Sequence, residues 1–421
     1  MRTLSLTLAA TLAALAAAFG GENFSPEAFL PQHEKTHAHE PVIAFGKDVF
    51  LVVWRAGMNE NADLVGLRLD KTGKALDAKP FVVSNAKDEQ SRPRVAFGGA
   101  PGGGGGVFLV VWQDLRNEKD YDVYAARVSA DGKVLDSEGI AVANAGKNQC
   151  EPAVSFDGKA FQVIWRDARS GGKYEVFGGR LSPDGRLLDG TGGLLQKPFR
   201  RFGERSWGVP GVHATAGGVV LAGARGGAEL HLWKMREGKS QGSLVKVPGQ
   251  KFNGEPMFAT DGKKVLVVWT TFMVGGGRSS GMLNSGTLLI DPGAPLASQK
   301  IKGKDYTADS KCLATTGVLY DNRKQVRHPW PAWDGKTYVV AWDIELSGKD
   351  RRRHDAVFLR RVSAAGEPLD KNTPVAGEFA SPAFRPTVAS DGAGTTLVAY
   401  ERHPKTGDVP IKIAFRMLKG K

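Results

Sequence analysis

The chain alternates short apolar runs with glycine-containing turns, and this pattern predicts β-strands throughout. The runs are rich in Val, Ile, Phe and Trp, as in Phe161-Gln-Val-Ile-Trp165, and these residue types are enriched in strands. Asp-Gly pairs such as Asp131-Gly132 separate many of the runs, and such pairs favour hairpin turns that need positive φ. No useful length of chain after residue 20 has a helical period. The pattern therefore predicts an all-β protein.

The strand pattern repeats about every 50 to 60 residues, a period typical of repeat folds. Each copy opens with Pro, reaches an apolar run that ends in Trp, and continues to an alternating strand and an Asp-Gly turn. Copies start near residues 40, 92, 151, 209, 255, 328 and 385, and the copy near 209 is the most divergent. Each copy holds four strand-like segments. We therefore predict a single seven-bladed β-propeller of four-stranded antiparallel blades over residues 21–421, with six or eight blades as alternatives.

The two ends of the chain predict how the ring closes. The last copy ends without a fourth strand-like segment, while Phe29-Leu30 is a spare apolar segment before the first copy. Phe29 precedes Pro41 by the same spacing that separates Phe81 from Pro93. We therefore expect the N-terminal segment to add the fourth strand to the last blade, which would remove two exposed strand edges.

One aromatic residue recurs at the end of the second strand-like segment. The set is Trp54, Trp112, Trp165, Trp269 and Trp342, with Tyr400 in the last copy. These side chains could stack on a ligand, or they could pack between adjacent sheets. We favour packing, because the position is fixed within the repeat.

The repeat units resemble those of bacterial secreted propeller proteins with the pattern LVVWxDxR…DVYGxRV…DGxxLD. Here they read Phe108-Leu-Val-Val-Trp112-Gln-Asp and Asp122-Val-Tyr-Ala-Ala-Arg-Val128. They are distantly similar to the sialidase-type propeller superfamily. The resemblance covers nearly all of the chain after residue 20 and implies the fold, but such folds support many roles. The chain has no Ser-x-Asp-x-Gly-x-Thr-Trp box and no convincing arginine triad with a Tyr–Glu pair, so we do not expect sialidase activity.

The first twenty residues predict export. Met1-Arg2 is a short basic start, Leu4 to Phe19 is apolar, and small residues follow up to Gly20. This is typical of a cleavable secretory signal, and it is short for a membrane anchor of about 20 apolar residues. We therefore expect a secreted or periplasmic protein without a membrane span.

The charge balance favours an acidic partner. The formal net charge is +13, and it becomes +12 once residues 1–20 are removed, because Arg2 is their only charged residue. A basic protein attracts anionic glycans, anionic surfaces or nucleic acid, and export argues against nucleic acid. The alternative is that the charge only keeps the protein soluble.

Only two cysteines are present, Cys150 and Cys312. One disulfide is compatible with an oxidising compartment. Lys302 to Arg327 is an insertion before the sixth copy, and we hypothesise that it folds across one face so that the two sulfurs pair.

The residue before the Pro of each copy is the main candidate for a binding site. In a propeller the first strand lines the central channel, so this residue would lie at the channel mouth. The candidates are Glu40, Arg92, Glu151, Glu255, His328 and Arg385, with a non-polar gap near Val209. In one interpretation these charges pair with each other, since crowded ionised groups must be paired. In the other they bind a polar ligand, with Glu40 or Glu255 as acid or base and Arg92 or Arg385 holding an anion.

Other basic and aromatic residues fall on loops of the same face. They are Arg201, Trp207, Trp330, Arg352 and His403, and arginine beside aromatic rings suits anionic sugars. A solvated charged rim is the alternative. His39, His328 and His403 could converge with Glu40, but a His-x-His pair is a weak metal signal, so we expect neither metal nor cofactor.

Three functions remain open at this point. The first is a non-catalytic binding or scaffold propeller for a glycan or protein, with an anionic ligand. The second is a carbohydrate-active hydrolase or lyase at the channel mouth, and the third is a structural spacer in the cell envelope. No catalytic residue is assigned, because no catalytic motif is complete. We expect a monomer.

Overall fold

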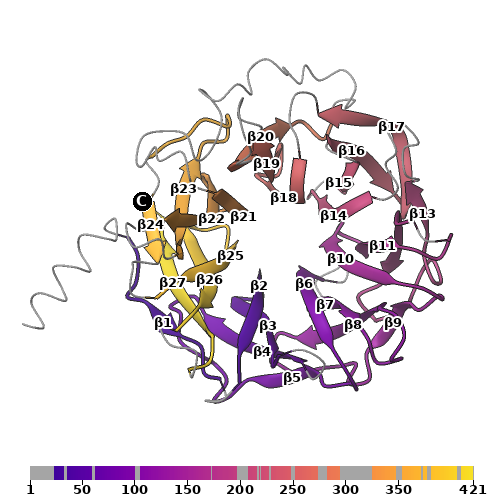
Figure 1. The fold of residues 1–421 in the computed structure, drawn as a ribbon, viewed down its shortest axis with the longest axis horizontal. Helices are drawn as coiled ribbons and strands as arrows, with labels where there is room; N and C mark the ends of the chain where they lie inside the picture. The colour runs from indigo at the N-terminus through magenta and orange to yellow at the C-terminus, as the bar shows by residue number, and fades with distance from the viewer. Residues whose placement is uncertain are drawn as a thin grey trace, which may run out of the picture.

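The structure, a computed structural model, describes residues 23–32, 36–58, 62–99, 105–171, 173–196, 207–215, 218, 220–226, 229–247, 252–273, 282–293, 325–347, 353–370, 373–376, 381–404 and 409–420. Within these ranges the regular structure is entirely β, and seven antiparallel sheets form a ring (Figure 1). The protein is thus a seven-bladed β-propeller, as the repeat predicts. The described part of the chain contains no helix that could cross a membrane.

The blades follow one another along the chain. Blade one is β2 (Ala38–Gly46), β3 (Val49–Ala56), β4 (Asp63–Asp70) and β5 (Phe81–Ser84). Blade two is β6 (Gln90–Gly98), β7 (Val107–Asp114), β8 (Asp122–Ser129) and β9 (Ile140–Ala143). Blade three is β10 (Gln149–Phe156), β11 (Phe161–Asp167), β12 (Glu175–Leu181) and β13 (Gly193–Gln196). Blade four is β14 (Trp207–Ala214), β15 (Val220–Gly226), β16 (Glu229–Arg236) and β17 (Lys239–Val247).

The remaining blades complete the ring. Blade five is β18 (Phe252–Thr260), β19 (Val265–Met273) and β20 (Met282–Ile290), which are its strands within the described residues. Blade six is β21 (Gln325–Trp333), β22 (Tyr338–Ser347), β23 (Arg353–Val362) and β24 (Thr373–Ala376). Blade seven is β25 (Ala383–Ser390), β26 (Thr395–Arg402), β27 (Lys412–Lys419) and β1 (Ala28–Phe29). The first strand of each blade lies nearest the centre of the ring (Figure 1).

The N-terminal strand closes the ring, as the spacing of Phe29 predicts. Ala28 pairs with Phe415 and Phe29 with Ala414. The Glu27 carboxylate beside this strand accepts a 2.5 Å hydrogen bond from the Tyr400 hydroxyl. Backbone pairing and a side-chain contact therefore fix the N-terminal strand to the last blade.

The recurring aromatic residues form the core between blades. Trp112, Trp165, Trp269, Trp342 and Tyr400 are fully buried, and Trp54 is 1% exposed, which confirms the packing interpretation. Blade four differs, because its buried Trp233 lies on the third strand opposite Ala222 of the second. In blade two the Trp112 indole donates a 2.8 Å hydrogen bond to buried Asp114.

Each first strand is interrupted by an irregularity at its Pro. The register between first and second strands shifts across this step in all seven blades. In five blades the residue before Pro has a left-handed backbone, namely Glu40 (φ 55°), Arg92 (55°), Glu151 (54°), His328 (48°) and Arg385 (46°). A bulge of this kind re-aims a side chain, and positive φ is strained for these residue types.

The packing role of the aromatic set leads to a stability prediction. Trp112→Ala should lower the free energy of unfolding by about 3–5 kcal/mol, the cost of truncating a buried aromatic side chain. Leu135→Ala is the control, since Leu135 is 39% exposed and its loss should cost less than about 0.5 kcal/mol. Equilibrium urea denaturation measures both, and equal losses would contradict the core assignment.

Candidate functional site

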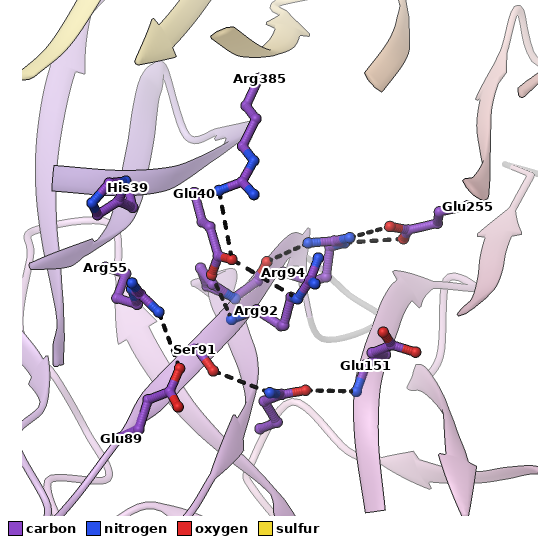
Figure 2. A network of polar contacts seen from close by, with 12 residues as sticks. His39, Glu40, Arg55, Glu89, Ser91, Arg92, Arg94, Glu151, Glu255 and Arg385 are labelled. Carbon is purple, nitrogen blue, oxygen red and sulfur yellow. Dashed lines mark hydrogen bonds and ion pairs between the residues drawn. The ribbon is translucent and has the colours of Figure 1, made fainter. Parts of the chain in front are cut away.

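A pocket opens at the centre of the ring, where the first strands begin. It encloses about 700 Å³, including space open to solvent. Five of the six predicted mouth residues line it, namely Glu40, Arg92, Glu255, His328 and Arg385, together with Arg94, Met257 and Trp330. Glu151 is the sixth, and it belongs to the same polar network although it does not line the pocket (Figure 2). We use "channel mouth" for this pocket below.

The Glu40 carboxylate is held by the blades on both sides of blade one. Its Oε2 accepts a 2.8 Å hydrogen bond from the backbone N–H of Arg92. Its Oε1 lies 3.8 Å from Arg92 Nε and 3.9 Å from Arg385 Nη1 (Figure 2). Glu40 therefore links blades seven, one and two at the mouth.

The other two predicted carboxylates are also paired with arginines. Arg94 Nε donates to Glu255 Oε1 at 3.2 Å, and Arg94 Nη2 contacts the second oxygen. The same guanidinium lies 5.5 Å from the centre of the Trp330 ring. Arg166 makes an ion pair with Glu151 within blade three. Paired charges therefore account for the acidic side of the network.

Two arginines and a histidine of the mouth, Arg92, Arg385 and His328, are much more exposed than the carboxylates. The exposed fractions of the Arg92, His328 and Arg385 side chains are 48%, 47% and 42%. Those of Glu40 and Glu255 are 15% and 18%. The accessible surface of the mouth is thus cationic, and the carboxylates lie beneath it.

Glu401, at the end of β26, is a buried acid that the sequence interpretation missed. It is 3% exposed, and its carboxylate lies 3.3 Å from His39 Nδ1, 3.0 Å from His403 Nε2 and 3.3 Å from Arg385 Nη1. Burial opposes its ionisation, but hydrogen bonds from His39 and His403 and the charge of Arg385 together lower its pKa. Glu401 is therefore an ionised anchor beneath the mouth.

Asp343 is the corresponding buried acid beneath the mouth in blade six. Its fully buried carboxylate lies 2.7 Å from His328 Nδ1 and 3.1 Å from Arg327 Nε. It also accepts a 3.3 Å hydrogen bond from the backbone N–H of Arg385. Asp343 and Glu401 both directly follow the aromatic residue of their second strand, as Trp342-Asp343 and Tyr400-Glu401. That repeat position is the sequence signal that could have found them.

In blades two, six and seven, the residue at this position after the aromatic links its blade to the next. Glu401 accepts a 2.9 Å hydrogen bond from the N–H of Glu40, and Gln113 accepts a 3.1 Å bond from the N–H of Glu151. Asp343 does the same for Arg385. Blade one has Arg55 here, which cannot accept, and the Glu40 side chain supplies the acceptor for blade two instead. The mouth residues are therefore positioned by bonds between blades.

The histidines do not all converge as expected. His39 and His403 meet at Glu401, whereas His328 contacts Asp343. Within the described residues, no group of three or more His, Cys, Asp and Glu side chains is placed to hold a metal ion. Trp330, expected on a loop, lies within β21 and lines the channel mouth.

Several predicted residues are described only in part. Arg201, Arg352 and Cys312 lie outside the described residues, and only the backbone of Trp207 is described, at the start of β14. Cys150 is buried, and burial, with the nearby charge of Glu151, raises the pKa of its thiol to about 11. Its pairing with Cys312 stays a prediction.

Comparison with solved structures found similarity at low sequence identity. No protein-family model and no curated protein sequence matches the chain. A Dyadobacter fermentans protein of unknown function is 10% identical, with a TM-score of 0.47, covering 95% of this chain and 100% of that one. A Penicillium chrysogenum α-L-arabinanase complexed with arabinobiose is 11% identical, with a TM-score of 0.46 and coverage of 92% and 98%. The phage phi92 endosialidase is 8% identical, with a TM-score of 0.47, covering 94% of this chain and 69% of that one. Similarity this low carries no argument about function.

The Glu401 cluster leads to a pH-dependent stability prediction. The folded-state pKa of Glu401 is below its unfolded value of about 4.3, so its contribution is fully present above that value and is lost as pH falls through the folded pKa. Glu401→Gln should cost about 1.5–3 kcal/mol at pH 7, since it replaces a charged acceptor of several hydrogen bonds by a neutral amide. The variant should also lose less stability than the wild type between about pH 5 and pH 2.

Urea denaturation across this pH range tests the prediction. Glu118→Gln is the control, because Glu118 is 58% exposed and a surface ion pair contributes at most about 1 kcal/mol. If the free energy of unfolding falls equally with pH for the wild type and for Glu401→Gln, Glu401 is not the anchor.

Proposed function

We propose that this protein is an exported, non-catalytic binding propeller that recognises an anionic glycan at the channel mouth. The observation that carries the proposal is the pair of exposed guanidinium groups of Arg92 and Arg385 above paired carboxylates. Guanidinium groups form strong charge-assisted hydrogen bonds with carboxylate and sulfate-like oxygens. The export component rests on the N-terminal sequence of residues 1–20.

The pocket favours a sugar over a flat protein surface. Trp330 and Met257 line it beside the cations, and an aromatic ring next to arginine suits the apolar face and the acid group of an anionic sugar. Small-ligand sites are typically concave, with a few polar groups that fix orientation. A glycan end carrying a carboxylate matches this combination of shape and charge.

A glycosidase at the mouth is less well supported. Glycoside hydrolysis requires one carboxyl group of a pair to carry a proton, and guanidinium partners stabilise the ionised form instead. Glu40, Glu151 and Glu255 all have arginine partners. A spacer would need no accessible cations, whereas Arg92 and Arg385 are nearly half exposed.

Binding to a glycan array at low and physiological salt tests the proposal. The wild type should retain an anionic class of glycan, with weaker binding at higher salt because exposed charges are screened. Arg92→Ala and Arg385→Ala should each weaken binding at least about tenfold, since each removes a charge-assisted hydrogen bond of about 1.5–3 kcal/mol.

Arg186→Ala is the matched control. Arg186 is exposed in the turn between β12 and β13, at the opposite end of its strands from the mouth, so its loss should leave binding unchanged. Absence of binding to every glycan would contradict the proposal and favour a protein partner or a spacer. Product release from a bound glycan would establish an enzyme.

A further inference from the structure

A second hollow lies at blade one, away from the channel mouth. It is lined by side chains that include Gln32, His37, Trp54, Met58, Asp63 and Val65. It shares no lining residue with the channel mouth. Its volume is about 1560 Å³ when space open to solvent is counted. We use "rim hollow" for it below.

In blades two and three the corresponding space is filled by a polar cluster. The Trp112 indole donates to Asp114, which also binds Arg116, and the guanidinium lies 3.8 Å from the centre of the Tyr124 ring. Blade three repeats this arrangement with Trp165, Asp167, Arg169 and Phe177. There the Arg169 guanidinium lies 4.4 Å from the centre of the Phe177 ring. The cluster thus consists of an acceptor for the indole, a guanidinium and an aromatic ring.

Blade one lacks all three components. The strand register places Ala56 opposite Asp63 and Val65 opposite Trp54, just as Asp114 lies opposite Asp122 and Tyr124 opposite Trp112 in blade two. Met58 follows Trp54 by the interval that separates Arg116 from Trp112. Ala, Met and Val therefore replace Asp, Arg and Tyr, and the rim hollow occupies the vacated space.

Two polar groups are left facing this space without partners. Among the described residues, no acceptor binds Trp54 Nε1, although the residue is only 1% exposed. Asp63 likewise has neither an ion pair nor a hydrogen bond within the described chain, and burial raises its pKa. The equivalent acids have partners, since Asp355 pairs with Arg327 in blade six and Asp122 accepts a 3.0 Å hydrogen bond from the Asn117 amide in blade two.

The other polar groups of the rim hollow do not neutralise the Asp63 carboxylate. His37 Nδ1 accepts a 3.3 Å hydrogen bond from the backbone N–H of Ile411. Burial and the neighbouring His39 and His403 lower its pKa, which favours the neutral ring. Lys79 is exposed and makes no ion pair in the described chain. Asp63 thus retains an unneutralised charge at a largely apolar wall.

We propose that the rim hollow binds a guanidinium or ammonium group carried on a small apolar ligand. The cation pairs with the Asp63 carboxylate, and Met58 and Val65 contact the apolar carrier beside the Trp54 indole. The ligand replaces the side chains that fill this position in blades two and three. This site is independent of the anionic ligand proposed for the channel mouth.

The indole N–H of Trp54 is a site-specific probe for this proposal. Its resonance in a ¹H–¹⁵N spectrum is assigned by its loss in Trp54→Phe. Butylguanidinium should shift this resonance saturably, and the neutral isostere butylurea should bind with at least tenfold lower affinity in the same titration. An acetyl-Gly-Arg-Gly amide arm shows whether the cation can also come from a peptide side chain, and preferential binding of that arm would identify a peptide as the source.

Two variants make the result decisive. Asp63→Asn removes the charge and should weaken butylguanidinium binding at least tenfold. Val65→Tyr restores the aromatic ring of blade two and should also weaken it at least tenfold by filling the hollow. Arg186→Ala is the control and should bind as the wild type does. Equal affinities for butylguanidinium and butylurea, unchanged binding by Val65→Tyr, or no shift with any probe would overturn the proposal, provided that the remaining indole resonances show a folded protein.

Discussion

The bulge before proline in each first strand is the constraint on which both the ring and its mouth depend. At Glu40, Arg92, Glu151 and Arg385 the bulged residue has positive φ, and its N–H leaves the ladder for a side-chain acceptor. A strained backbone costs about 1–3 kcal/mol, and a hydrogen bond contributes about 1.5–3 kcal/mol when the acceptor is a carboxylate and about 0.5–1.5 kcal/mol when it is the neutral Gln113 amide. These magnitudes are similar, so the bulge is stable only while the preceding blade supplies its acceptor. The same hydrogen bonds therefore hold adjacent blades together and orient the mouth residues.

This coupling explains the layered charge of the mouth. Carboxylates are the acceptors best suited to strained N–H groups, so Glu40, Asp343 and Glu401 lie inward and have little exposed surface. Arginines then neutralise these acids, and Arg385 extends from the buried layer to the solvent. Because the cations are fixed from below, a ligand would find them preorganised, which lowers the entropic cost of binding.

The sequence predicts the fold well because its repeat is dominated by local rules. Apolar alternation, Asp-Gly turns and the position of Trp112 or Trp165 are set within one blade, and the interval from Phe29 to Pro41 predicts ring closure. The site is predicted only in part. The placement of Glu40 and Arg385 follows from strand order. The role of Glu401 depends instead on residues of blades seven and one that come together only in the folded ring. The repeat position after Tyr400 marks Glu401 itself, but no spacing in the sequence indicates that His39 and His403 bind it.

Divergent copies limit the prediction in a second way. In blade four the large aromatic moves from the second strand to Trp233 of the third, so aligning the second-strand segments alone misses a core residue. In blade one the Trp-x-Asp-x-Arg pattern becomes Trp54-Arg-Ala-Gly-Met58. Loss of the buried Asp–Arg pair would ordinarily leave the blade edge unsupported. The N-terminal segment supports it instead, since the N–H of Gly57 donates to the His37 carbonyl at 2.8 Å and the N–H of Ala38 donates to Ile411 at 3.0 Å. Backbone hydrogen bonds thus fix the walls of the rim hollow without the Asp–Arg pair that fills this space in blades two and three. For that reason the space can persist as a preformed cavity.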